Sequence, residues 1–243
     1  MQYWGITDAG CVRAQNQDTF TVERLDKNTF LCVVCDGMGG AKSGNIASSL
    51  ASEVFTQEVK RSFVSGMDPE AIDQMLESAV KLANFTVFDQ SRQFEEFAGM
   101  GTTLVAVLVC GKSVTFVNVG DSRGYLISQN GIEQITQDHS LVQIMLSRGE
   151  LSKEQVRNYP GKNLITRAIG TEPVVQCDLF HKELKRGDCL LLCSDGLSGL
   201  MDDQEILFEV VHGVSKELCP QRLLNIAKNR GAPDNVTCVL AVI

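Results

Sequence analysis

Residues 29–40 read Thr-Phe-Leu-Cys-Val-Val-Cys-Asp-Gly-Met-Gly-Gly, an apolar run that ends in one acid and three glycines. The run from Thr29 to Cys35 has strand length and is rich in β-branched and aromatic residues, so it predicts a buried strand. Asp36 follows where a rigid strand meets a loop, and Gly37 lets the backbone approach a ligand closely. The stretch therefore predicts a strand that carries a carboxylate into a cleft.

The same pattern of an acid at a strand end occurs three more times. Gly120-Asp121 follows the run 114–119, Ser194-Asp195-Gly196 follows the run 190–193, and Asp234-Asn235 precedes the run 236–243. A single Asp-Gly pair can be a simple turn. Four acids that face one another would raise each other's pKa, and a bound divalent cation removes that cost. Oxygen ligands without His or Cys favour Mg²⁺, Mn²⁺ or Ca²⁺ over zinc.

The segment Arg13-Ala14-Gln15-Asn16-Gln17-Asp18 adds a cation and a fifth acid. Arginine stays charged and binds phosphate through two parallel hydrogen bonds. Surface Arg and Asp residues are usually solvated, so this segment gains meaning only beside the strand-end acids. Arg13 is a candidate phosphate ligand, and Asp18 is a further candidate metal ligand.

The order of the predicted elements indicates the fold class. Strands are predicted at Thr29–Cys35, Thr102–Cys110, Ser113–Val119, Gly124–Ser128, Cys189–Cys193 and Val236–Ile243, and helices at Ser43–Phe63, Pro69–Phe88, Asp203–His212 and Pro220–Asn229. Turn residues at 111–112 and 129–131 join neighbouring strands as hairpins. Grouped helices among such strands favour an α+β fold with antiparallel sheets. Because the last element is a strand, we expect one interwoven domain over residues 1–243.

The periodic pattern weakens between residues 139 and 171. A short helix is expected at Ser140–Arg148, and Ser152 is a candidate cap for a second one at 153–158. We interpret this part as a surface flap near the metal site. Loops on a rigid scaffold often set specificity, although the flap could also be a plain connection.

Composition and charge exclude several classes of function. The net charge of −8 disfavours nucleic acid and anionic membranes as partners. No apolar run reaches the ~18 residues that span a membrane. The nine cysteines and the absence of a signal-peptide pattern at Met1–Gly5 predict a reducing cytoplasm. Cys32 and Cys35 have CxxC spacing, but inside an apolar run we expect them to be buried small hydrophobes.

Seven motifs together resemble the type 2C (PPM) metal-dependent protein serine/threonine phosphatases in their compact bacterial form. They occur in the family's order and extend nearly from end to end. They are Arg13-x-x-Asn16-Gln17-Asp18, Val34-Cys35-Asp36-Gly37-Met38-Gly39-Gly40, Gly101-Thr102-Thr103, Gly120-Asp121-Ser122-Arg123, Asp138-His139-Ser140, Ser194-Asp195-Gly196-Leu197 and Asp234-Asn235-Val236-Thr237.

The resemblance implies a fold and an assignment of ligands. The fold is an antiparallel β-sandwich flanked by pairs of helices, four layers in the order α-β-β-α, with the metals at one end. Asp36 would bridge two ions, Mn²⁺ or Mg²⁺, and Gly37 would add its carbonyl. Asp195 and Asp234 would complete the shell of the first ion.

The other roles implied by the resemblance concern the second ion, the substrate and a weaker third ion. Asp18 would lie near the second ion, and Asp121 together with Asp195 would hold the third. Arg13 would bind the substrate phosphate. Asn235 would orient the ligands from behind.

Two positions depart from the family pattern. Some members have Glu at the position of Gln17, where it can serve the second ion. Gln cannot supply that charge, so either Asp18 contributes more here or the second ion is held more weakly. Many eukaryotic members have His at the position of Met38, where it is a proposed general acid. Met38 has no proton to donate, so the leaving-group proton would come from water or another residue.

The resemblance implies hydrolysis of phosphoserine and phosphothreonine on proteins by a water that bridges two ions, without a covalent phosphoenzyme. No cysteine is followed six residues later by the arginine that cysteine-based phosphatases need. The implied partners are phosphorylated proteins, substrates of a bacterial Ser/Thr kinase, and the implied state is a monomer. The alternatives are a pseudophosphatase that binds phosphopeptides and a small-molecule phosphoesterase. His139 could act as a base, but we favour a structural role that anchors the flap.

Overall fold

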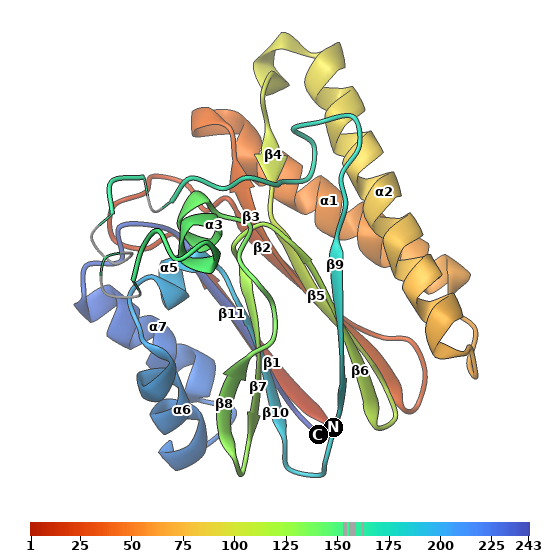
Figure 1. Cartoon of the computed structure of the whole chain (residues 1–243), viewed down its shortest axis with the longest axis vertical. Coiled ribbons are helices and arrows are strands. Elements are labelled where there is room, and N and C mark those ends of the chain that lie inside the picture. The colour runs from red at the N-terminus through yellow and green to blue at the C-terminus, as the bar shows by residue number, and fades with distance from the viewer. Residues whose placement is uncertain (153–154, 156–158, 162) are drawn as a thin grey trace.

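The computed structural model describes residues 1–152, 155, 159–161 and 163–243. Two antiparallel sheets pack face to face, and helices cover the outer face of each sheet (Figure 1). The predicted α+β sandwich of four layers is therefore confirmed. The predicted helix at 153–158 falls largely outside the described residues.

The first sheet has the order β2-β3-β5-β6-β9 and lies under the two longest helices. Its strands are β2 (Asp18–Arg24), β3 (Thr29–Met38), β5 (Leu104–Cys110), β6 (Ser113–Val119) and β9 (Asp178–Glu183), and the short β4 (Gly101–Thr102) pairs with the end of β3. The helices are α1 (Gly40–Ser62) and α2 (Pro69–Gln93), followed by a 3₁₀ turn η1 (Glu95–Phe97).

The second sheet has the order β1-β11-β10-β7-β8, so the last strand in sequence lies next to the first. Its strands are β1 (Gln2–Asp8), β11 (Val236–Val242), β10 (Cys189–Cys193), β7 (Arg123–Ser128) and β8 (Gly131–Gln134). Its helices are α5 (Asp195–Ser198), α6 (Asp203–His212) and α7 (Cys219–Asn229), and α3 (Leu141–Ser147) lies in the long β8–β9 connection.

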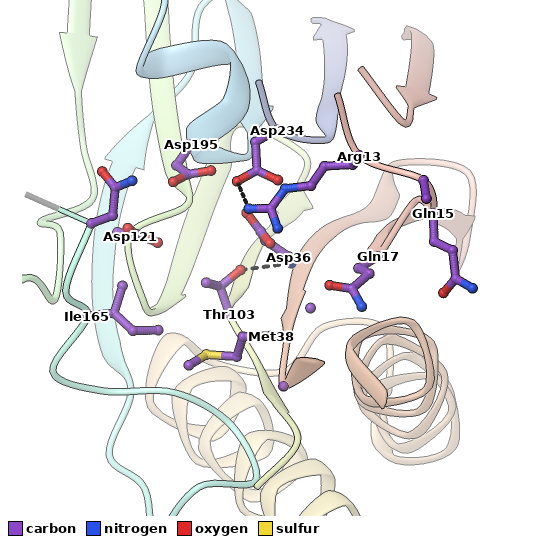
Figure 2. Close-up of a pocket in the computed structure, with 14 residues that line it drawn as sticks. Arg13, Gln15, Gln17, Asp36, Met38, Thr103, Asp121, Ile165, Asp195 and Asp234 are labelled. Atoms are coloured by element: carbon purple, nitrogen blue, oxygen red, sulfur yellow. Dashed lines mark hydrogen bonds and ion pairs between the residues drawn. The ribbon is translucent and has the colours of Figure 1, made fainter. Parts of the chain in front are cut away.

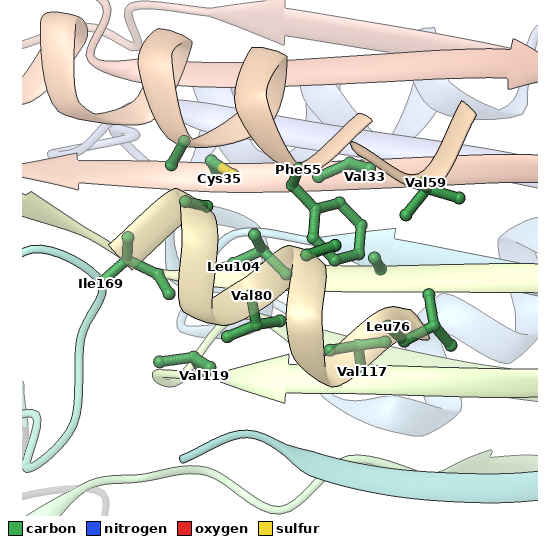
Figure 3. Close-up of a cluster of buried hydrophobic side chains, with 14 of the residues drawn as sticks. Val33, Cys35, Phe55, Val59, Leu76, Val80, Leu104, Val117, Val119 and Ile169 are labelled. Carbon is green, nitrogen blue, oxygen red and sulfur yellow. The ribbon is translucent and has the colours of Figure 1, made fainter. Parts of the chain in front are cut away.

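Strand β3 is buried on both faces, which explains its unbroken apolar run. On one face Val33 and Cys35 pack with Phe55 of α1 and the α2 residues Leu76 and Val80 (Figure 3). On the other face, Phe30, Cys32 and Val34 pack against the second sheet. Alternate side chains of a strand point to opposite faces, so both faces must be apolar here.

The two cysteines of the CxxC spacing consequently lie in different clusters. Cys32 faces the second sheet and Cys35 faces the helices. Burial raises the pKa of both thiols. The pair is buried as predicted, on opposite faces of β3, and is not arranged to bind one zinc ion.

The strands outside the predicted ranges are β1, β2, β8 and β9, and of these only β8 was implied, by the hairpin turn at 129–131. Each is an edge strand. Edge strands bury fewer side chains, and their mixed polar and apolar sequences give a weak strand signal. The predicted strand Thr102–Cys110 is divided into β4 and β5, with Thr103 at the break.

The connection 140–171 is less superficial than expected. Val142, Ala168 and Ile169 are buried, and Ile169 belongs to the core beneath α1 and α2. Bridges tie Ser140 to Ile165 and Thr102 to Ile169. The interpretation as a surface flap is therefore wrong for the end of this segment, which packs against β4.

Within the described ranges, no helix is long and apolar enough to cross a membrane.

Candidate metal centre and active site

Four of the five predicted acids meet at one end of the sandwich. Asp36 lies in β3, Asp121 follows β6, Asp195 begins α5, and Asp234 precedes β11. All four line a cavity of about 570 Å³ (Figure 2). Residues more than 190 positions apart are thus brought together because the strands that carry them end at the same edge.

Asp18, the fifth acid, lies behind this cavity and not on its wall. It pairs directly opposite Asp36 in the β2–β3 ladder and is only 6% exposed. Ser194 Oγ donates to its Oδ2 at 2.7 Å. Its Oδ1 has no hydrogen-bond partner among the residues that the structure describes. A buried carboxylate oxygen without a donor is in the state that a cation would relieve.

Hydrogen bonds from Thr102 and Thr103 fix the backbone of Asp36. The Asp36 N–H donates to Thr103 Oγ1 at 2.9 Å, and the Thr103 N–H donates back to the Asp36 carbonyl at 2.9 Å. Thr102 Oγ1 donates to the same carbonyl at 2.8 Å. The carboxylate therefore projects into the cavity from a backbone that is held on both sides.

Gly37 has no room for a side chain. A Cβ at this position would lie 2.0 Å from the Gly44 carbonyl oxygen and 2.6 Å from that of Gln17. The Gly37 N–H donates to the Gln17 carbonyl at 3.1 Å. The absence of a side chain thus lets β3, the loop before β2 and the start of α1 meet at the cavity wall.

The acids strongly perturb one another. Burial, followed by the charges of Asp18 and Asp195, raises the pKa of Asp36 well above its usual value. Burial and the charge of Asp195 raise the pKa of Asp121 to about 7. Burial raises the pKa of Asp18 to about 6, and burial and Asp234 raise the pKa of Asp195. Without a counter-charge the cluster takes up protons, so its chemistry suits divalent cations.

The spacing of these acids indicates what kind of ion they suit. In the described parts of the chain, no three Asp, Glu, His or Cys side chains are grouped tightly enough to hold one ion alone. Mg²⁺ commonly takes one or two carboxylates and keeps several waters. An open cavity with dispersed carboxylates fits such partly hydrated ions better than a closed all-protein cage.

Arg13 lines the same cavity and is bound to one of the acids. Its Nη2 donates to Asp234 Oδ2 at 2.8 Å, with its side chain 55% exposed (Figure 2). This hydrogen bond, together with the charge of Asp234, raises the pKa of Arg13. The predicted phosphate ligand and a predicted metal ligand therefore pair with each other in this structure.

Asn235 holds the loop that carries Arg13. Its Nδ2 donates to the carbonyls of Ala9 and Gln15 at 3.0 and 2.9 Å, and its Oδ1 accepts from the Gln17 N–H at 2.8 Å. It is 4% exposed. The structure thus places Asn235 behind the cavity, where its side chain fixes backbone and its own N–H donates to Asp234 Oδ1 at 2.8 Å.

Gln17 and Met38 both line the cavity. The two departures from the family pattern therefore lie where they matter for the chemistry. A neutral amide and a thioether occupy these positions, and the thioether has no proton to transfer.

Sequence reasoning assigned no role to Thr103 or Ser194. Thr103 holds Asp36, and Ser194 donates to Asp18 while its Oγ accepts from the Thr237 N–H at 3.0 Å. Both belong to motifs quoted above. The sequence offered two signals for these roles: Ser194 directly precedes a predicted metal ligand, and Thr103 belongs to one of the seven family motifs.

Comparison with known proteins agrees with this geometry. The family model described as Protein phosphatase 2C matches residues 12–228. The serine/threonine phosphatase stp of Listeria monocytogenes serotype 4b is 36% identical over 237 residues, which cover 96% of this chain and 92% of that protein.

Solved structures give the same result. The serine/threonine phosphatase Stp1 from Staphylococcus aureus superposes with a TM-score of 0.94 at 36% identity, covering 100% of this chain and 95% of that one. The catalytic domain of the serine/threonine protein phosphatase PstP, in complex with two manganese ions, gives a TM-score of 0.87 at 33% identity, with 99% and 97% covered. The chain is therefore a phosphatase of the protein phosphatase 2C family.

Proposed function

We propose that this enzyme removes phosphate from phosphoserine and phosphothreonine on proteins, using two Mn²⁺ or Mg²⁺ ions at the strand-end aspartates. The observation that carries the proposal is one cavity lined by four aspartates from separate segments together with Arg13. The manganese in the related PstP domain supports divalent ions as the cofactor.

The cluster suggests which residues hold which ion. Asp36, the most central acid, would contact two ions, and the Gly37 carbonyl would add a ligand. Asp195 and Asp234 would serve the first ion, partly through water, and Asp18 would serve the second through the oxygen that has no hydrogen-bond partner among the described residues. When bound, such ions activate a water for attack on phosphorus and neutralise phosphoryl charge.

Asp121 is placed to extend the cluster to a third, weaker ion. It lies on the Asp195 side of the cavity, and its pKa responds to the charge of Asp195. Asp121 and Asp195 would share this ion.

Arg13 would bind the substrate phosphate. Its guanidinium is exposed at the cavity, and it can exchange Asp234 for the phosphoryl oxygens, where charge is spread in the transition state. Binding of a cation to Asp234 would favour this exchange because it weakens the carboxylate's hold on the arginine.

No cysteine lines the cavity among the residues that the structure describes, so a thiol-based covalent intermediate is disfavoured. Cys35 is the cysteine nearest to Asp36 in sequence, but it is fully buried in the helix-facing core, and burial raises the pKa of its thiol. Attack by water is therefore the favoured route. Met38 donates no proton, so water in the cavity would protonate the leaving alkoxide.

The substrates we propose are proteins modified by a bacterial serine/threonine kinase, met by a monomeric enzyme in the cytoplasm. Support comes from the relatives, which are named serine/threonine phosphatases, and from the open cavity at the surface.

The test compares hydrolysis of a phosphothreonine peptide and of p-nitrophenyl phosphate with Mn²⁺, with Mg²⁺ and with EDTA. We expect metal-dependent turnover of the peptide and a loss of at least ~10³-fold for Asp36→Asn, since one residue serves two ions. Asp26→Asn is the matched control, because Asp26 lies in the distant β2–β3 turn. Turnover that survives complete metal removal would overturn the proposal.

Two other results would select the alternatives. Turnover of small esters alone would indicate a small-molecule phosphoesterase. Tight phosphopeptide binding without turnover would indicate a pseudophosphatase.

A further inference from the structure

The turn that carries Asp121 is packed tightly against the residue that holds Asp36. Gly120 has a φ of +109°, and a Cβ there would lie 2.6 Å from the Thr103 side chain. Ser122 Oγ lies 2.8 Å from Thr103 Oγ1. Any displacement of the turn 120–122 therefore moves Asp121 relative to Asp36.

His139 holds Gly120 by both of its backbone groups. The Gly120 N–H donates to His139 Nδ1 at 3.0 Å, and the His139 N–H donates to the Gly120 carbonyl at 2.9 Å. The imidazole is 7% exposed, and it is not among the residues that line the cavity. On this side of the ring, it acts on the site through the backbone next to Asp121.

The other ring nitrogen of His139, Nε2, supports the segment 163–167, which forms a second wall of the cavity. Because Nδ1 accepts a hydrogen bond, the proton of the neutral ring is on Nε2, which donates to Asp178 Oδ2 at 3.1 Å. Arg167 donates to Asp178 Oδ1 at 2.7 Å, and the Thr166 N–H donates to the His139 carbonyl at 2.8 Å.

These contacts fix the segment 163–167, which faces the substrate space. Asn163 and Ile165 both line the cavity. Ile165 lies on the same side of the cavity as Asp121 (Figure 2). One buried imidazole is thus shared between the turn of a metal-ligand candidate and the segment beside it.

We propose that His139 is a positioning residue with two separable duties: its Nδ1 places Asp121 through Gly120, and its Nε2–H places the segment 163–167 through Asp178. The inference rests on the proposed function, in which Asp121 binds an ion. It adds that the segment 163–167 contacts the protein substrate.

Amide side chains can separate the two duties. In His139→Asn, the amide oxygen can replace Nδ1 and accept from Gly120, but the side chain is too short to reach Asp178. In His139→Gln, the amide nitrogen can replace Nε2–H and donate to Asp178, while the Gly120 N–H loses its acceptor. His181→Asn is the matched control, since His181 on β9 pairs with Asp73 away from the cavity.

The experiment measures Mn²⁺ binding by calorimetry, hydrogen exchange of segments 120–122 and 163–167, and kcat and KM on a phosphothreonine peptide. His139→Gln should weaken the Mn²⁺ site that Asp121→Asn also weakens, by about tenfold, with KM near that of the wild type. His139→Asn should keep that site, raise KM several-fold and increase exchange in 163–167 only.

The outcomes separate the inference from the function on which it rests. Equal effects of the Asn and Gln variants on every readout, or no effect of either, would overturn the positioning role while the wild type still binds Mn²⁺ and hydrolyses the peptide. A wild type that binds no Mn²⁺ would overturn the proposed function and this inference together.

Discussion

Asp18 is a residue that we expect to destabilise the metal-free protein and to favour the metal-bound one. Its carboxylate is buried opposite Asp36, one oxygen lacks a partner among the described residues, and its pKa is raised to about 6. At neutral pH the metal-free chain must hold buried like charges or take up protons, and a bound cation would remove this cost.

Asp18→Asn should therefore stabilise the metal-free protein and weaken its response to metal. In EDTA at pH 7.5 the free energy of unfolding should rise by about 1–3 kcal/mol, because a buried charge and its repulsion from Asp36 are removed. The stabilisation that Mn²⁺ adds should shrink. Urea unfolding with and without Mn²⁺ measures both, with Asp26→Asn as control, and a variant less stable than the wild type in EDTA would contradict this.

At the residue scale, the sequence predicted the acids better than their supports. An aspartate beside an apolar strand is visible in the sequence because strand and acid are adjacent. The partners of Thr103 and His139 lie 67 and 19 residues away. Only the folded chain shows which group a hydroxyl or imidazole will meet.

Helix α2 contributes to the site through one buried amide rather than through its apolar face. Asn84 Oδ1 accepts from the Gly170 N–H at 2.8 Å, and its Nδ2 donates to the carbonyls of Glu172 and Pro173 at 3.0 and 3.3 Å. Asn84 is 1% exposed. The helix thereby fixes the end of the connection whose earlier part lines the cavity.

Asn84→Ala should destabilise the protein by about 2–3 kcal/mol, because a buried N–H and two carbonyls lose their partners. Asn84→Asp keeps an acceptor for the Gly170 N–H, but it loses the donors and turns a carboxyl oxygen toward the Glu172 and Pro173 carbonyls, so it should also be less stable than the wild type. Hydrogen exchange should therefore increase around residue 170 in the Ala variant more than in the Asp variant. Equal exchange in both variants would argue against the Gly170 contact as the main support.

At the scale of elements, whether a strand could be predicted from the sequence depended on its position in the sheet. The interior strands β3, β5, β6, β7, β10 and β11 were found, most of them apolar on both faces, whereas the edge strands β1, β2, β8 and β9 were not among the predicted ranges. The residue Thr103 between β4 and β5 was included in one predicted strand, since nothing in the local pattern marks a break. The burial of Ile169 depends on α2 and β4, so local composition suggested a surface flap.

The whole molecule places its charge cluster at one end of a sandwich whose three clusters of buried side chains are apolar. The stability of the protein should therefore depend on metal and pH together. In the metal-free protein, acids with a raised pKa bind protons more strongly when folded than when unfolded.

The metal-free protein should lose stability as pH rises from about 4 to about 7, the window between the ordinary pKa of aspartate and the values of about 6 and 7 for Asp18 and Asp121. Mn²⁺ should remove most of this loss. The measurement is the difference in unfolding free energy with Mn²⁺ and with EDTA at each pH, because groups such as Glu205 contribute equally to both. A difference that stays constant across the window would contradict the role of the cluster.

Strand β11 lies between β1 and β10 although it is the last strand in sequence, and the two ends of the chain lie side by side (Figure 1). During translation β1 leaves the ribosome before β11, although in the described sheet β11 is the strand with which β1 pairs. Until residue 242 has left the ribosome, the nascent chain has no partner for β1, and nothing holds Asp234 in its place before β11. Dephosphorylation by this enzyme should begin only after translation has passed β11, so that an unfinished chain cannot act on phosphoproteins near the ribosome.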